Sequence, residues 1–75
     1  MFRYAEGDTV ALKENYAKLG LCAGDTGVIW VLYDTVPPAY DVTFCDAEGR
    51  ALDMVLDEDE LKAPAPSRHL VATTA

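Results

Sequence analysis

The segment that decides the fold contains three stretches, Asp25-Thr-Gly-Val-Ile-Trp-Val-Leu-Tyr33, Ala39-Tyr-Asp-Val-Thr-Phe-Cys45 and Arg50-Ala-Leu-Asp-Met-Val-Leu56. Large apolar residues recur at every second position in each stretch, which is the period of a strand with one buried face. These positions carry even numbers: Val28, Trp30, Leu32, Tyr40, Val42, Phe44, Leu52, Met54 and Leu56. The regularity predicts three strands of a small, strongly curled β-sheet whose even-numbered side chains form the core.

Two shorter segments add elements to this sheet. Residues 8–13 alternate in the same way, with Val10 and Leu12 on one side of a half-buried strand. The acidic residues 57–60 suit one turn of helix, because acidic side chains favour a helix amino terminus. Residues 61–63 then supply a short last strand. We expect the first and last strands to lie at the edges of the sheet.

The connections and ends of the chain complete the predicted architecture. Residues 14–24 lose the alternation and form an irregular loop, residues 46–49 suit the turn of a hairpin, and Gly27 marks a bulge or sharp bend inside its strand. Residues 1–63 are predicted to form the barrel and residues 64–75 a flexible C-terminal tail. The predicted fold is all-β, a small five-stranded, SH3-like, partly open barrel with one short helical turn before the last strand.

A longer pattern of glycines and apolar residues runs through the chain: Val10-x-Leu12, Gly20-Leu21-x-x-Gly24-x-x-Gly27-Val28, Tyr40-x-Val42-x-Phe44-x-Asp46-x-x-Gly49 and Leu61. It resembles a family of short bacterial SH3-like proteins catalogued only as a domain of unknown function, over residues 6–63. The resemblance implies a partly open barrel, similar in shape to those of translation-factor and nitrile-hydratase subunits, and it brings no catalytic residues. Cys22 and Cys45 do not match the cysteine-rich metal motif of nitrile hydratase catalytic subunits, so that activity is not implied.

The charge of the chain restricts its partners. Its 75 residues include 13 acidic and 6 basic ones, a formal net charge of −7. This charge repels phosphate backbones and anionic lipid heads, so we expect neither nucleic acid nor a membrane as a partner. A nucleic-acid binder of the translation-factor type is therefore the poorest functional hypothesis. A basic protein surface is the kind of partner that this charge attracts.

Size and targeting signals bound the context of the chain. A domain of 75 residues builds one modest core, and such a core rarely supplies more than about 3–5 kcal/mol without a disulfide, a metal or an oligomer. We therefore expect a homo-oligomer, with a dimer favoured. No apolar run approaches the ~18 residues of a membrane span, and residues 1–6 lack the order of a secretory signal. The expected location is the cytoplasm, where Cys22 and Cys45 are expected to be free thiols.

No set of residues predicts catalysis. The two cysteines have no neighbouring histidine, since His69 lies in the predicted tail, so no zinc site is expected. Paired carboxylates could hydrolyse sugars only beside a wide cleft, whereas side chains fill the interior of so small a barrel. We expect a protein that is not an enzyme and that binds no cofactor or metal.

The acidic residues form a candidate docking surface for a basic partner: Asp46, Glu48, Asp53, Asp57, Glu58, Asp59 and Glu60. They lack the glycine and the ligand order of a calcium loop. For the acidic run at residues 57–60, the favoured interpretation is a solvated turn. Docking of a basic partner is the alternative.

Trp30 has two interpretations. Its even number predicts a core tryptophan that supplies much of the buried area. The alternative is an aromatic groove, built with Tyr16, Tyr33 or Tyr40, that receives a proline-rich strand. The core interpretation is favoured.

The odd-numbered positions suggest a function. Ile29, Val31, Tyr33 and Val55 should point away from the core, and an exposed apolar patch of this kind marks an interface. Our first hypothesis is a non-enzymatic acidic protein-interaction module that self-associates through this row or through an edge strand. The alternative is an inhibitor or immunity-type protein whose acidic surface mimics nucleic acid and occupies a basic protein site.

Overall fold

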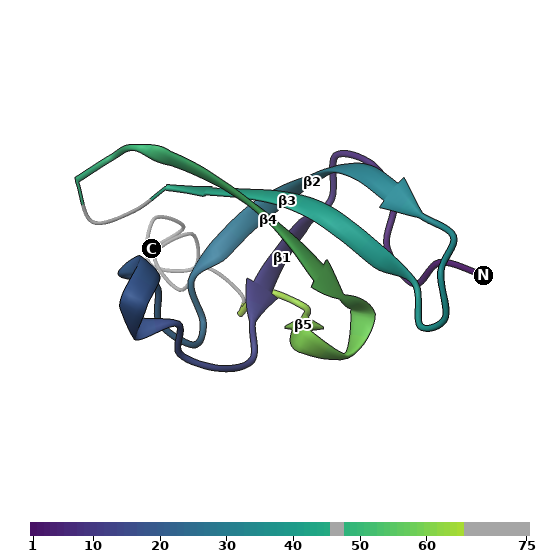
Figure 1. The fold of residues 1–75 in the computed structure, drawn as a ribbon, viewed down its shortest axis with the longest axis horizontal. Helices are drawn as coiled ribbons and strands as arrows, with labels where there is room; N and C mark the ends of the chain where they lie inside the picture. The colour runs from purple at the N-terminus through teal and green to yellow at the C-terminus, as the bar shows by residue number, and fades with distance from the viewer. Residues whose placement is uncertain (46–47, 66–75) are drawn as a thin grey trace, which may run out of the picture.

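A computed structural model of the chain describes residues 1–45 and 48–65. Within that part the elements are five strands and two 3₁₀ turns, in the order β1 (Thr9–Leu12), η1 (Ala17–Leu19), β2 (Thr26–Tyr33), β3 (Ala39–Cys45), β4 (Ala51–Asp57), η2 (Glu58–Glu60) and β5 (Leu61–Lys62). The strands form one antiparallel sheet that curls into a half-barrel (Figure 1). The predicted all-β, five-stranded, partly open fold with a helical turn before the last strand is confirmed. None of the helical segments among these residues has the length and apolar character to cross a bilayer.

The β3–β4 hairpin is the most regular part of the sheet. Its residues pair one to one from Ala39 opposite Asp57 to Cys45 opposite Ala51, without a register shift. Gly49 has a φ of +83°, a left-handed conformation that favours glycine where the chain enters β4. The predicted hairpin is confirmed, although residues 46–47 of its turn lie outside the described residues.

The strand order places β4 and β5 at the edges of the sheet, in the sequence β4-β3-β2-β1-β5. β1 is internal because β5 pairs along its second side, with Ala11 opposite Lys62 and Leu12 opposite Leu61. The expectation that the first strand is an edge is therefore wrong. η2 returns the chain from β4 to β1, and its end is held where the Lys13 N–H donates to the Glu60 carbonyl at 3.1 Å.

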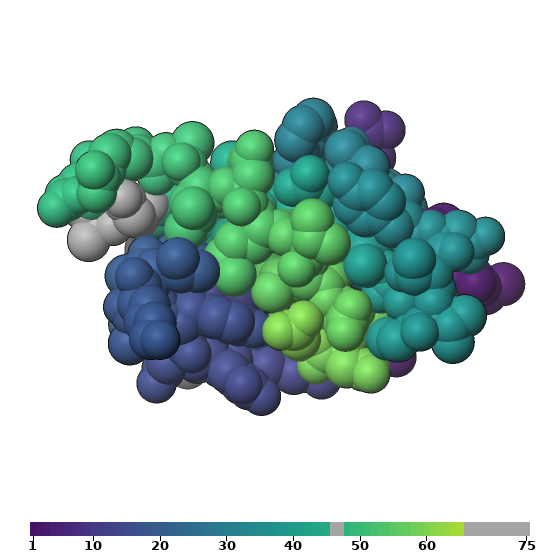
Figure 2. Space-filling view, in the orientation of Figure 1, coloured from purple at the N-terminus to yellow at the C-terminus, as the bar shows by residue number. Residues whose placement is uncertain are grey.

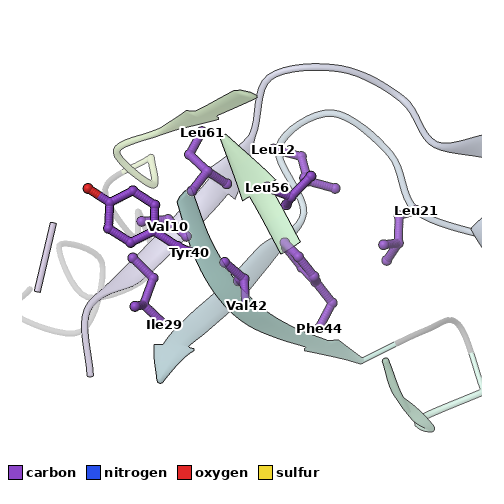
Figure 3. Close-up of a cluster of buried hydrophobic side chains, with 9 residues drawn as sticks. All are labelled: Val10, Leu12, Leu21, Ile29, Tyr40, Val42, Phe44, Leu56 and Leu61. Carbon is purple, nitrogen blue, oxygen red and sulfur yellow. The ribbon is translucent and has the colours of Figure 1, made fainter. Parts of the chain in front are cut away.

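The core lies on the concave side of the curled sheet. All five strands contribute to it, and Leu21 joins from the loop after η1 (Figure 3). Its buried members are Val10, Leu12, Leu21, Ile29, Tyr40, Val42, Phe44, Leu56 and Leu61. Leu32, Leu52 and Met54 are partly buried against this cluster. The predicted inward direction of the even-numbered residues is thus right in β3 and β4.

β2 departs from the predicted alternation because it contains a bulge. Ile29 pairs with Val42 but Val31 pairs with Asp41, so Trp30 is an extra residue in β2. An extra residue reverses which side of the sheet the following positions face. Ile29 is fully buried, whereas Val28 is 47% and Trp30 48% exposed. The predictions of Val28 and Trp30 as core residues and of Ile29 as an outward residue are therefore wrong.

Gly27 lies inside β2 at a point where a side chain would not fit. A Cβ atom there would lie 2.7 Å from the Thr43 carbonyl oxygen and 2.8 Å from the ring of Phe44. The ring of Phe44 thus packs directly on the backbone of β2. The strand bulges three residues later, at Trp30, rather than at this glycine.

The loop between β1 and β2 is irregular, as predicted, and is fixed by local hydrogen bonds. Its 3₁₀ turn η1 ends at Gly20, and Tyr16 forms an isolated bridge with Leu21. The Asn15 side chain accepts from the Ala23 N–H at 2.8 Å. These contacts hold Leu21 in the core.

Candidate interaction face

The convex side of β2, β3 and β4 carries a group of exposed apolar side chains. We call this surface the outer face; its residues are Val28, Trp30, Val31, Tyr33, Asp41, Thr43, Asp53 and Val55. Val55 is 61%, Val28 47%, Trp30 48% and Tyr33 38% exposed. Apolar residues that are grouped on a surface, rather than scattered singly, mark interaction sites.

The register of the three strands brings these residues side by side. Val31, Asp41 and Val55 form one row across β2, β3 and β4. Val28, Thr43 and Asp53 form a second row. Opposite side chains on a sheet lie about 4.5–5.5 Å apart between Cβ atoms. Two valines therefore flank Asp41 in the first row, whereas Thr43 lies between Val28 and Asp53 in the second.

The outer face contains most of the row predicted from odd numbering. Val31, Tyr33 and Val55 lie on it, with Val31 partly buried. Ile29 does not, because the bulge leaves it in the core. Sequence reasoning missed Val28 and Trp30, since a single period was applied along the whole of β2.

Asp41 is the one residue whose position on the outer face conflicts with its chemistry. Its Oδ1 atom is inaccessible to solvent and has no hydrogen-bond partner, and no other side-chain nitrogen or oxygen among the described residues is in that state. An unpartnered buried acceptor costs about 1–3 kcal/mol. The neighbouring Asp53 differs, because its Oδ1 accepts from the Thr43 hydroxyl at 2.6 Å.

The free edge of β4 adjoins the outer face. The Glu58 N–H donates to the Pro38 carbonyl at 2.8 Å, and this bond continues the β3–β4 ladder. It shows that the even-numbered residues of β4 are those whose backbone groups bond to β3. Backbone groups of successive strand residues point to alternate sides, so Ala51, Asp53 and Val55 direct theirs to the free edge. Figure 2 shows β4, in green, at the surface of the molecule.

The acidic turn η2 binds two tyrosines that are distant in sequence. The Tyr40 hydroxyl donates to Glu58 Oε2, which also accepts from the Arg3 N–H at 2.8 Å. Burial, and then the bond to Glu58, raise the pKa of Tyr40, while the Tyr40 and Arg3 bonds lower the pKa of Glu58. The rings of Phe2 and Tyr4 pack edge-on against Tyr40, at 5.9 and 5.6 Å between centroids.

Glu60 makes the second of these contacts. The Tyr16 hydroxyl donates to Glu60 Oε2 at 2.7 Å, and burial together with this bond raises the pKa of Tyr16 to about 12. Glu60 Oε1 also accepts from the Asp57 N–H at 2.9 Å, as part of a capping box. Glu58 and Glu60 therefore attach the N-terminal segment and the β1–β2 loop to the barrel, so η2 is more than a solvated turn.

The structure does not collect the predicted acidic docking residues in one place. Asp57 and Asp59 lie with the two glutamates at the C-terminal end of β4, whereas Glu48, paired with Arg50, lies at the hairpin end. Asp46 lies outside the described residues.

The other candidate sites are separated as well. Tyr40 belongs to the core and Tyr16 bonds to Glu60, while Trp30 and Tyr33 lie on the outer face, so these aromatic residues line no common groove. Both cysteines are exposed free thiols, as expected. Residues 1–45 and 48–65 contain no group of three His, Cys, Asp or Glu side chains that could hold a metal ion, and His69 lies outside them.

Comparison with known proteins identifies the family but no characterised relative. The model of the family described as "Domain of unknown function (DUF4926)" matches residues 6–63, and the chain belongs to this family. A search of curated proteins finds no match, and a search of solved structures finds none either.

Proposed function

We propose that this chain is a non-enzymatic protein-interaction module that self-associates, with a dimer as the simplest assembly. The observation that carries the proposal is the outer face, where Val28, Trp30, Tyr33 and Val55 remain 38–61% exposed beside a free strand edge. A half-barrel with five antiparallel strands and a 3₁₀ turn before the last one also supports an SH3-like description. The two free thiols support a reducing location such as the cytoplasm.

The small size of the domain supports self-association. The described part of this 75-residue chain forms a single modest core, and oligomerisation is one of the ways in which small domains gain stability. Burying an exposed valine fully contributes about 1.5–3 kcal/mol, so covering Val55 and its neighbours would be a substantial addition.

Sedimentation velocity between 1 and 100 µM, concentrations that span weak to moderate affinity, tests the proposal. We expect a reversible dimer that Val55→Asp weakens about tenfold or more, because the substitution removes apolar contact and adds like charge. The matched control is Val36→Asp, since Val36 is a fully exposed valine in the β2–β3 loop, away from the outer face. A wild-type chain that stays monomeric at every concentration contradicts the proposal, as does an equal effect of the two substitutions.

Docking of a basic partner protein is the second candidate function, and Asp41 favours it. An arginine or lysine side chain from such a partner would pair with the carboxylates of Asp41 and Asp53 on the outer face, and the net charge of −7 would attract it. Salt dependence distinguishes the two candidates. Salt screens the repulsion between two acidic copies and strengthens a dimer, whereas it weakens binding to a basic partner.

A further inference from the structure

We infer that two copies join by antiparallel pairing of their β4 edges, with the twofold axis at Met54. This inference rests on the proposed self-association and specifies its contact along the β4 edge, next to Val55, while Trp30 and Tyr33 on β2 stay uncovered. β4 is seven residues long and lies at one end of the sheet, and no strand among residues 1–45 and 48–65 pairs with its second side. An unpaired edge of this length is a template for strand addition by another chain.

Backbone geometry restricts the pairings that are available. The groups that point to the free edge belong to odd-numbered residues, as described above for Ala51, Asp53 and Val55. In a symmetric pair these residues must lie opposite odd-numbered residues of the other copy to exchange hydrogen bonds. Pairings centred on Asp53, Met54 or Val55 satisfy this condition and overlap along most of the strand.

Charge selects one of these three registers. A register centred on Asp53 places Asp53 opposite the partner's Asp53. A register centred on Val55 places Asp53 opposite the partner's Asp57. Directly opposed like charges destabilise a pair of strands. Centring on Met54 places Asp53 opposite the partner's Val55 and Ala51 opposite the partner's Asp57, so no aspartate opposes another.

The Met54 register also matches apolar residues on the concave side. Leu52 and Met54 are only partly buried in one copy, because they lie next to the open edge of the half-barrel. In this register Leu52 lies opposite the partner's Leu56, and the two Met54 side chains meet at the axis. The core of each copy then continues into the core of the other. The Asp41 carboxylates of the two copies lie on the outer faces and remain apart.

Disulfide trapping reads the register directly. Even-numbered residues of β4 form non-hydrogen-bonded pairs across the new edge, with Cα atoms about 4.5 Å apart, and this spacing suits a disulfide. Met54→Cys in a Cys22→Ser, Cys45→Ser background should therefore cross-link rapidly on mild oxidation. The matched control, Val55→Cys in the same background, should not, because the two Val55 positions are offset diagonally by about 7–8 Å.

Sedimentation of the wild-type chain in the same experiment separates the inference from the proposed function. A dimer with selective cross-linking through Met54→Cys supports both. A dimer in which Val55→Cys or neither variant cross-links overturns the Met54 register and leaves self-association standing. A wild-type chain that is monomeric throughout overturns both.

A backbone substitution tests the edge independently of disulfide chemistry. Val55→Pro removes an N–H that points away from β3, so the internal ladder keeps its hydrogen bonds. We expect it to weaken dimerisation about tenfold or more, whereas Val55→Thr, which keeps the N–H and the β-branched shape, should change it less than about threefold. Circular dichroism of each monomer checks the fold. Equal dimer affinity in a folded Val55→Pro variant contradicts edge pairing.

Discussion

Gly27→Ala should destabilise the monomer through a close contact that the structure defines. The added Cβ would lie 2.7 Å from the Thr43 carbonyl oxygen and 2.8 Å from the Phe44 ring, and both distances are shorter than real Cβ contacts allow. The carbonyl belongs to the β2–β3 ladder and cannot withdraw freely. Overpacking of this kind costs about 1–3 kcal/mol. Alanine also restricts the unfolded chain, which returns about 0.4–1 kcal/mol.

The expected net loss from Gly27→Ala is about 1–2 kcal/mol, a large share of the few kcal/mol available to so small a domain. Urea unfolding followed by circular dichroism measures it as a lower midpoint with an unchanged slope. Thr26→Ala, at the exposed neighbouring position of β2, is the control and should change the free energy of unfolding by less than about 1 kcal/mol. A Gly27→Ala variant as stable as the wild type would refute the reasoning that Phe44 packs on the backbone of β2.

Three further predictions concern the titratable groups. Because the Tyr40 and Arg3 bonds hold the pKa of Glu58 below its unfolded value, the stability that they add is present above the unfolded pKa and lost as pH falls through the folded one. Acid unfolding should therefore be less steep in Glu58→Gln, and an unchanged acid limb would contradict this linkage. The pKa of Tyr16 is raised to about 12, so the stability that its bond to Glu60 adds is complete below the unfolded value of about 10 and lost as pH rises to 12. Absorbance at alkaline pH should show late tyrosine ionisation from both Tyr16 and Tyr40, and Tyr16→Phe should remove the part that lies near pH 12. Asp41→Thr should raise the free energy of unfolding of the monomer by about 0.5–1 kcal/mol, because it removes an unpaired buried acceptor, and a loss of stability in urea would argue that Asp41 has a partner within the fold.

The sequence predicts those parts of the fold that depend on local signals. Alternation in β3 and β4, the hairpin between them and the acidic turn before β5 are all present in the structure. The strand order was not predictable in the same way. Whether β5 pairs with β1 depends on the path of the chain through η2, and nothing in the alternation of residues 8–13 distinguishes an internal strand from an edge.

The candidate site depends more strongly on tertiary structure. β2 is apolar at nearly every position from Val28 to Tyr33, so its composition suits either side of the sheet, and one extra residue at Trp30 determines the outcome. The Tyr16–Glu60 and Tyr40–Glu58 contacts join residues 44 and 18 positions apart. Their acidic members were visible in the sequence as a charged run, but their tyrosine partners could not be assigned from spacing.

The bulge in β2 links the fold to the outer face. It turns Leu32 inward to lie opposite Tyr40, and it leaves Trp30 and Val31 as consecutive residues beside Asp41. The half-barrel buries only one side of this strand, so the monomer keeps Trp30 half exposed and Asp41 Oδ1 without a donor. Neither feature stabilises a lone copy, and contact of the outer face with another molecule would cover Trp30. The outer face and the open edge of β4 are therefore better explained as parts of an assembly than as the surface of an isolated domain.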